Sequence, residues 1–494
     1  MSTSGVSQRE ATLAARNGVK LAGSMFVTMA VAFAVRFLLP RYLGPEVFGK
    51  MHFAEAFATG FFVLTSLGFD VYISKEVANR PGHASDFFGG LLLLRVVLSA
   101  VTLGIMAGML HWMGKSPMEY GLVGLFAAWQ VAFLLNNTLT ALLNANSTVG
   151  ELALLNILTK LMWGGGIVFV MWCRGSPYAL AHCFLWAEVV KAFFLFRVVY
   201  QRMGLQLRLD LKATWAVALC SMPYFLTVLI SRIYQKLDVS MISKHGWDLE
   251  VGWYGAAANV SAIIVLFLPL ATSVVLPMSA RIAKQESFEA MSKVMRSAVR
   301  VVLVSSMVLC LLCVLHAQAI VQTLFGASYA PSARTLQAIA PTFPLTYVAC
   351  LLAIQLFHLK REWYTTLASF VGLLVNAGLN LWFIPHGKSW LGDGGAGFGA
   401  SMATLTTEIT VTTMMLIALG RSAVDEHFWP SLGKLALACG LVAGLHQMLP
   451  ALGLWRVGLE VPAYFGLVAL LDVPPVRGFW RMGMTQLRQR FLRA

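Results

Sequence analysis

Long apolar stretches recur along almost the whole of this chain, and they constrain its fold more than any other feature. A helix that crosses a bilayer needs about 20 mainly apolar residues, and about fourteen stretches meet this requirement. They are 18–40, 52–74, 88–110, 118–142, 151–173, 178–200, 221–243, 252–277, 299–321, 335–357, 363–385, 396–419, 431–450 and 456–473. The connecting segments are short, so the sequence predicts an all-α polytopic membrane protein without a soluble catalytic domain.

The composition agrees with this prediction. Of the 494 residues, 58% are hydrophobic and 12% are charged, whereas water-soluble domains carry about 25% charged residues. A chain with this large a fraction of apolar residues is not intrinsically disordered. Its 7 cysteines lie mostly inside the apolar stretches, which argues against a disulfide-stapled secreted domain.

The basic residues indicate an orientation. The net charge is +15, and most lysines and arginines fall in connecting segments on the same side as the N-terminus, such as 197–212, 281–300 and 477–493. Cytoplasmic loops carry such an excess. We therefore expect a bacterial inner-membrane protein with both termini cytoplasmic, and no nucleic-acid partner. The tail 475–494 mixes arginine with apolar residues, which predicts an amphipathic helix on the membrane lipids.

A weak internal repeat predicts the domain organisation. Segment 47–59 can be laid over 250–262, which puts Gly49 on Gly252. We expect an N-terminal bundle at 1–212, a C-terminal bundle at 213–425, two further spans at 426–474, and the tail. With about six spans in each bundle, both copies enter the membrane from the same side, an arrangement used by transporters that rock two bundles around a central site.

Once the connecting segments are assigned, six lysines and arginines remain inside the predicted spans, Lys191 among them. An ionisable group at the bilayer centre costs at least about 2.5–3.5 kcal/mol, so it faces a cavity or a partner. The predicted cationic, substrate-binding side chains are Arg36, Arg95, Lys160, Arg232 and Lys236. Arg232 is the sharpest case, because no carboxylate lies one turn away on its own helix, and Lys236 follows on the same face. For Arg95 and Lys160, structural pairing is an equal alternative.

Acidic side chains inside the spans are candidates for ion coupling. Glu188 and Glu408 lie on corresponding spans of the two copies, and Asp238 lies near the predicted height of Arg36. Each is a candidate to carry H⁺ or Na⁺, although Glu188 is also spaced to pair with Lys191. No nucleotide-binding loop of the G-x-x-x-x-G-K-[ST] type occurs. The sequence therefore predicts no cofactor, no metal and no catalytic residue.

Several segments resemble one family when they are taken in order along the chain. They are Asn17, RYLGPEVFG (41–49), LGFDVYISKEVANRP (67–81), KLDVSMI (236–242), VGWYGAAANV (251–260), LFGASYAPSA (324–333), NAGLNLWFIP (376–385) and GAGFGASMATLTTE (395–408). This ordered set is similar to the multidrug/oligosaccharidyl-lipid/polysaccharide (MOP) exporter superfamily, specifically its Wzx-type polysaccharide flippase branch.

The resemblance implies a function. It implies a fold of about fourteen helices with two six-helix lobes, and translocation of a polyprenyl-pyrophosphate-linked oligosaccharide from the cytoplasmic to the periplasmic leaflet. A basic cavity suits the pyrophosphate, because arginine and lysine bind phosphate groups. A polysaccharide polymerase and glycosyltransferases are the expected partners, in O-antigen or exopolysaccharide export.

Other functions remain open. A multidrug or cation antiporter of the same superfamily needs an acidic cavity, whereas the intramembrane charges here are mainly basic. A lipid II flippase is disfavoured, because spans 18–40 and 52–74 lack an arginine-rich pattern. A membrane enzyme such as a polymerase or ligase would need a long periplasmic loop, and none is predicted. A lipid scramblase or a scaffold is a further alternative.

Overall fold

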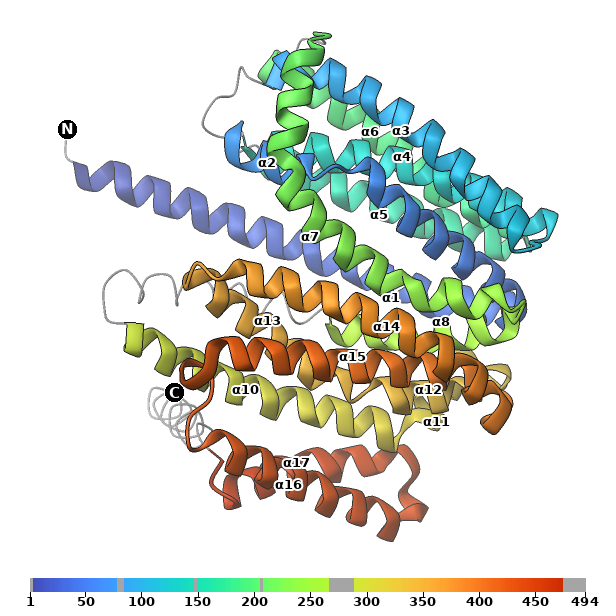
Figure 1. Ribbon diagram of the computed structural model, residues 1–494, viewed down its shortest axis with the longest axis vertical. Helices are drawn as coiled ribbons and strands as arrows, with labels where there is room; N and C mark the ends of the chain where they lie inside the picture. The colour runs from blue at the N-terminus through green and yellow to red at the C-terminus, as the bar shows by residue number, and fades with distance from the viewer. Residues whose placement is uncertain (1–2, 78–83, 146–148, 205–207, 266–287, 474–494) are drawn as a thin grey trace, which may run out of the picture. The chain divides into compact units, whose positions relative to one another are not determined.

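The computed structural model describes residues 3–77, 84–145, 149–204, 208–265 and 288–473. These residues form α-helices and short 3₁₀ turns and include no strand (Figure 1), so the predicted all-α class is confirmed. The predicted amphipathic tail at 475–494 and the end of predicted span 252–277 lie outside the described residues.

The chain divides into two compact units, Met1–Gly252 and Trp253–Ala494. The helices of the first unit are α1 (Thr3–Phe62), α2 (Phe69–Glu76), α3 (Ala84–Trp112), α4 (Pro117–Ala145), α5 (Val149–Trp172), α6 (Pro177–Met203) and α7 (Leu211–Lys244). Helix α8 (Asp248–Val265) begins at the end of this unit. The second unit contains α10 (Phe288–Leu315), α11 (Ala317–Phe325), α12 (Ser332–Ile339), α13 (Thr342–His358), α14 (Glu362–Leu391), α15 (Gly395–Leu419), α16 (Phe428–Met448) and α17 (Val457–Leu470).

Ten described segments are long and apolar enough to cross a membrane, which makes this a multi-pass membrane protein. The first of them, Val27–Thr65, covers two predicted spans, because α1 is interrupted at Gly44. There the backbone adopts a φ of 71° that glycine tolerates, and the chain turns back (Figure 1). Predicted spans 221–243 and 456–473 fall on α7 and α17, which are not among the ten.

Local sequence signals fix several helix ends. Ser176 caps α6 by accepting a hydrogen bond from the Ala179 N–H, Pro177 occupies the first turn, and Gly204 ends the helix in a left-handed conformation. Asp210 caps α7 by accepting hydrogen bonds from the backbone N–H groups of Lys212 and Ala213. These caps set where α6 and α7 begin.

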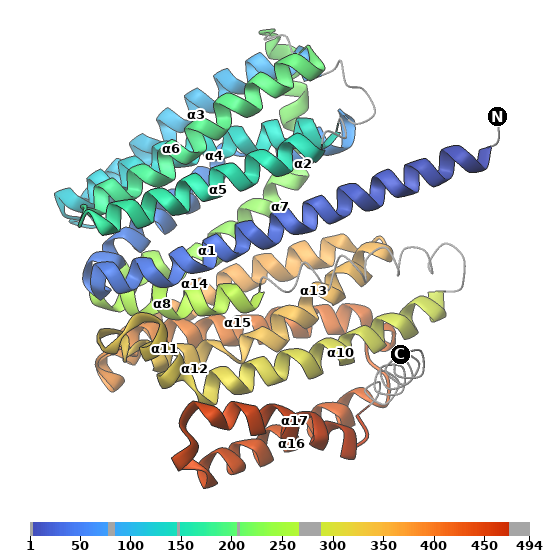
Figure 2. The same ribbon diagram turned by 180° about the vertical axis from the view of Figure 1, so that it is seen from behind.

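In the first unit, α3, α4, α5 and α6 lie side by side (Figures 1 and 2). Helix α7 packs against α1, α2 and α3. Phenylalanines fill the core at one end, where Phe69, Phe87 and Phe88 are fully buried with Leu139 and Leu195. Because α7 packs on these helices, the unit extends to Gly252, whereas the repeat predicts a boundary at 212/213; the repeat-based domains remain a prediction.

Helices α1 and α8 cross at two glycines. A Cβ atom on Gly49 would lie 1.9 Å from the carbonyl oxygen of Asp248, and one on Gly252 would lie 1.9 Å from that of Pro45. The contact is reciprocal, because the alignment that puts Gly49 on Gly252 also puts Pro45 on Asp248. Only glycine allows the two backbones to come so close.

In the second unit, α14 and α15 form the tightest helix pair. A Cβ atom on Gly387 would lie 2.4 Å from the carbonyl oxygen of Gly395, and one on Gly399 would lie 2.1 Å from that of Phe383. Helix α10 packs on α13 and α16, and α16 packs on α17 (Figure 2). Buried residues such as Met295, Leu351, Leu435 and Tyr464 fill the space between them.

Candidate functional site

An apolar cavity in the first unit contains one of the predicted cationic side chains. Its volume is about 210 Å³, and it is bounded by the second half of α1, by Met109 of α3 and by α7. Lys236 is the charged residue in this described lining, which also contains Phe57, Gly60 and Ile233. Arg232 lies one turn earlier on α7, and its side chain is exposed.

Other charged side chains lie within electrostatic range of His52 on α1, on which Lys236 of the cavity also acts. His52 and Glu55 are three residues apart on α1, and so on one face. The charges of Glu55, Lys236 and Arg36 all act on the His52 imidazole. The structure therefore brings Arg36 and Lys236, predicted from different spans, into one group.

Lys160 of α5 belongs to the same neighbourhood. Its ammonium interacts with Glu188, Lys191 and Arg36, and it lies 4.5 Å from the centre of the Trp163 ring. A cation over an aromatic face is stabilised in the absence of a full ion pair. The Trp163 ring thus helps to stabilise the Lys160 ammonium.

Glu188 of α6 is buried, with 8% of its surface exposed. The side-chain amide of Asn136 on α4 donates to its carboxylate at 2.7 Å and to its backbone oxygen at 2.8 Å. Glu188 also interacts electrostatically with Lys191, the partner that the spacing predicts. An acidic group held in this way beside lysines can exchange a coupling ion, but it can equally fix α4 against α6.

Arg95 of α3 lies elsewhere in the first unit and has an acidic neighbour. Its guanidinium is 3.6 Å from the Asp70 carboxylate of α2 and donates to the carbonyl oxygen of Leu134 at 2.9 Å. The Thr138 hydroxyl donates to the same carboxylate at 2.7 Å. These contacts join α2, α3 and α4, so the structure favours the structural alternative for Arg95.

The two remaining acidic candidates belong to different units. Asp238 is buried on α7 of the first unit, with 4% of its surface exposed. Glu408 is half-buried on α15 of the second unit and accepts a hydrogen bond from the Thr346 hydroxyl at 3.3 Å.

One end of the first unit is closed by a polar cluster. Lys115, between α3 and α4, donates to the Ser243 carbonyl oxygen at 2.8 Å and hydroxyl at 2.7 Å, and pairs with Glu119 at 2.9 Å. Asp248 lies 3.7 Å from Lys50 of α1. Burial and the nearby Glu119 charge raise the pKa of Asp248. These contacts tie the start of α4 to the end of α7, and α1 to the start of α8.

The sequence prediction missed His52. The signal was available, because His52 and Glu55 place two polar groups on one face of an apolar span. Glu55 alone does not identify a site, and only the fold brings it and His52 near Arg36 of the same helix and Lys236 of α7.

Residues 14–283, more than half of the chain, match the family of polysaccharide biosynthesis proteins. The chain belongs to this family. The assignment to the MOP superfamily is thereby supported, while the Wzx-type branch is a finer assignment. No curated protein has a sequence significantly similar to this one.

Solved structures share the fold at low sequence identity. The lipid II flippase MurJ in an inward closed conformation has a TM-score of 0.70 at 15% identity, covering 93% of this chain and 99% of MurJ. An inward-facing multidrug resistance transporter of the MATE family has a TM-score of 0.58 at 13% identity, covering 81% and 94%. A MOP superfamily transporter from Pyrococcus furiosus, described as having a binding pocket of reversed polarity, has a TM-score of 0.54 at 15% identity, covering 82% and 96%. The fold is that of MOP transporters.

Proposed function

We propose that this protein translocates a polyprenyl-pyrophosphate-linked oligosaccharide from the cytoplasmic to the periplasmic leaflet by alternating access. The observation that carries the proposal is a group of basic side chains in the first unit. Lys236 lines an apolar cavity, and Arg36 interacts electrostatically both with Lys160 and with His52, on which Lys236 also acts. Membership in the polysaccharide biosynthesis family supports the same conclusion.

The chemistry of this group suits a lipid-linked pyrophosphate. Lysine and arginine form charge-assisted hydrogen bonds with phosphate oxygens, and the cost of holding them in the membrane falls when an anion neutralises them. The polyprenyl chain is apolar and can stay in the lipid. A cationic drug would be repelled by the same side chains, which disfavours a multidrug antiporter.

The driving force in this proposal is an ion gradient or the membrane potential. Glu188, Asp238 and Glu408 are the candidate groups for H⁺ or Na⁺, because carboxylates bind both ions. The protein then acts as a transporter rather than an enzyme. We place it in the bacterial inner membrane with cytoplasmic termini, beside the polymerase and glycosyltransferases that make a surface polysaccharide such as O-antigen.

The test uses proteoliposomes that contain a polyprenyl-pyrophosphate oligosaccharide and carry an imposed H⁺ or Na⁺ gradient. Arrival of the glycan in the other leaflet is followed with an impermeant lectin. We expect Arg232→Ala and Lys236→Gln to lower the transport rate about 10-fold or more at unchanged membrane abundance, since a hydrogen bond to a charged group is worth about 1.5–3 kcal/mol. The matched control is Lys212→Gln, an exposed lysine in the first turn of α7.

The same vesicles separate the proposal from its alternatives. Transport of lipid II alone, with no transport of other lipid-linked glycans, would assign the chain to the lipid II alternative. Efflux of a small cationic dye without glycan movement would indicate the antiporter. Normal glycan transport by Lys236→Gln would rule out the cavity as the binding site, and normal transport by Arg232→Ala would remove Arg232 from the proposed cationic group.

A further inference from the structure

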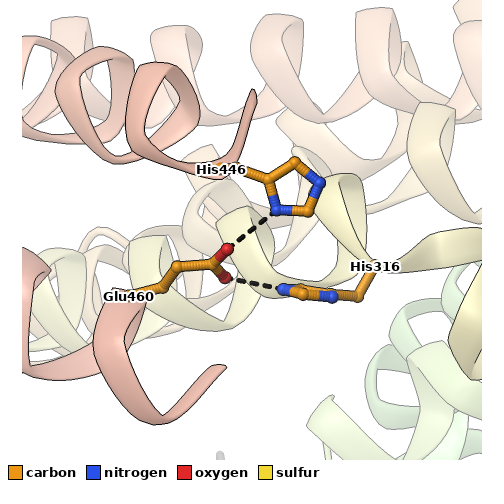
Figure 3. Close-up of side chains that lie close together, drawn as sticks. All are labelled: His316, His446 and Glu460. Carbon is orange, nitrogen blue, oxygen red and sulfur yellow. Dashed lines mark hydrogen bonds and ion pairs between the residues drawn. The ribbon is translucent and has the colours of Figure 1, made fainter. Parts of the chain in front are cut away.

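Two histidines and one glutamate of the second unit converge at the ends of three helices (Figure 3). His316 lies between α10 and α11, His446 lies in the last turn of α16, and Glu460 lies in the first turn of α17. His316 Nε2 is 2.6 Å from one carboxylate oxygen of Glu460, and His446 Nδ1 is 2.8 Å from the other.

The cluster is almost completely enclosed. The side chains of His316 and Glu460 are 4% and 2% exposed, while His446 is 18% exposed. A buried carboxylate needs partners that offset its lost hydration, and here one imidazole comes from the α10–α11 junction and the other from α16. The partly exposed edge of His446 gives the cluster access from outside.

We propose that His316, His446 and Glu460 bind a divalent transition-metal ion of the zinc class. One ligand atom from each residue lies within 4.8 Å of the others, and two imidazoles with one carboxylate form a donor set that zinc uses with a fourth position left for water. A metal there would fasten α16 and α17 to the junction of α10 and α11.

The three side chains must adjust to hold the metal, because the two imidazole nitrogens now contact different oxygens of Glu460. Bonds of about 2.0–2.1 Å in a tetrahedral site separate neighbouring ligand atoms by roughly 3.3 Å, so the nitrogens must move away from Glu460 by roughly 0.5 Å. Each neutral imidazole keeps its proton, which moves to the ring nitrogen that faces away from the metal. No oxidant or other reactant is required.

Arg456 makes the proposal testable, because it opposes this proton shift. Its Nη1 lies 3.3 Å from His446 Nε2 and donates to the His446 backbone oxygen at 2.9 Å. Arginine has only donors, so without metal Nε2 accepts and the proton lies on Nδ1, facing Glu460. Metal on Nδ1 requires the proton on Nε2, toward the guanidinium.

A metal site and a metal-free hydrogen-bond network therefore predict different effects of Arg456→Gln. The glutamine oxygen can accept a hydrogen bond from Nε2–H, and the nearby positive charge is gone, so the metal should bind several-fold more tightly. If the cluster were only a hydrogen-bond network, the same substitution would have no effect on metal affinity.

The site is on the side that the lysine and arginine distribution predicts to be periplasmic, since Arg456 falls in a segment of that side. The proposal does not depend on the proposed transport, because the site is built from the second unit alone and is assayed by metal binding.

The experiment titrates the purified full-length protein in detergent with Zn²⁺ against a chromophoric chelator, and with Co²⁺ by visible absorption. We expect one equivalent bound and a tetrahedral Co²⁺ spectrum, and at least 10-fold weaker binding in His446→Gln and Glu460→Gln. The exposed His427→Gln is the control and should bind as the wild type does. The Co²⁺ spectrum of the unmodified protein remains informative if a ligand variant fails to fold.

Three results would overturn the proposal. They are absence of stoichiometric binding to the unmodified protein, equal affinity in the wild type and His446→Gln, and an octahedral Co²⁺ spectrum typical of loosely bound metal. None of these results bears on glycan transport in the vesicle assay. The metal-site proposal can therefore fail while the transport proposal stands, and the reverse also holds.

Discussion

At the scale of single residues, the pairing of Arg95 with Asp70 decides how one intramembrane charge is tolerated. The Arg95 side chain is 9% exposed, and Asp70 is the carboxylate beside it. Asp70→Asn would leave a buried guanidinium without a counter-charge, and we expect it to lower the free energy of unfolding by about 1–3 kcal/mol. Thermal unfolding in detergent measures this loss.

The control for this prediction is an exposed ion pair of the same type. Asp86 lies 3.7 Å from Arg208, and both side chains are about half exposed, so Asp86→Asn should change stability by less than about 1 kcal/mol. If the two variants were equally stable, the pairing with Asp70 would have no structural role. Arg95 would then again be a candidate to bind substrate.

Residue type and position in the sequence were enough to identify the intramembrane charges, but not their partners. Arg36, Lys160 and Lys236 belong to three different helices, and only tertiary packing brings their charges within range of one another's neighbours. Packing also places Arg95 beside Asp70. The pattern also gave no sign of the His316 cluster, because His316 lies more than a hundred residues before His446 and Glu460.

At the scale of helices, the crossing of α1 and α8 depends on two glycines. Because a methyl group on Gly252 would lie 1.9 Å from the Pro45 oxygen, Gly252→Ala must push the helices apart. We expect a loss of about 1–3 kcal/mol in the free energy of unfolding, as for other overpacked contacts. Gly49→Ala should cost a similar amount, since it blocks the same crossing.

The double variant tests whether the two glycines act together. Two substitutions at one contact are less than additive, because the first has already separated the backbones. Gly124→Ala on α4 is the control, since nothing lies within 4 Å of its added Cβ, and it should be neutral or stabilising by about 0.5–1 kcal/mol. Additive losses would show that the two glycines serve separate contacts.

Helices were predictable wherever an apolar run alone decides the structure. The predicted spans 88–110, 118–142 and 178–200 lie inside α3, α4 and α6. Interruptions were not predictable, because they depend on local backbone geometry. Predicted span 299–321 is broken at His316, whose backbone is not helical, and this break is what points the imidazole toward Glu460.

At the scale of the whole molecule, fold and function carry different information. The TM-score of 0.70 with MurJ over nearly the full length of both chains shows a common architecture, and a MATE transporter shares it too. One architecture that serves such different transporters does not specify a substrate. The substrate proposal therefore depends on which charges face the cavity, and the coupling ion on which carboxylates are free to exchange it.

Glu408 gives the final prediction, because it belongs to the second unit, whereas the basic group belongs to the first. Glu408→Gln preserves the shape of the side chain and the hydrogen bond from Thr346, but removes the charge and the exchangeable ion. We expect the variant to keep gradient-independent glycan movement and to lose its acceleration by an imposed gradient. Comparing H⁺ with Na⁺ gradients in the wild type would identify the ion.

Thr346→Val separates coupling from packing at the same place. It removes the hydrogen bond to Glu408 but leaves the carboxylate in position, so coupling should persist in this variant and be absent from Glu408→Gln. If both variants responded to the gradient as the wild type does, Glu408 would be a packing residue between α13 and α15. Coupling would then have to depend on Glu188 or Asp238, which puts both the substrate group and the ion group in the first unit.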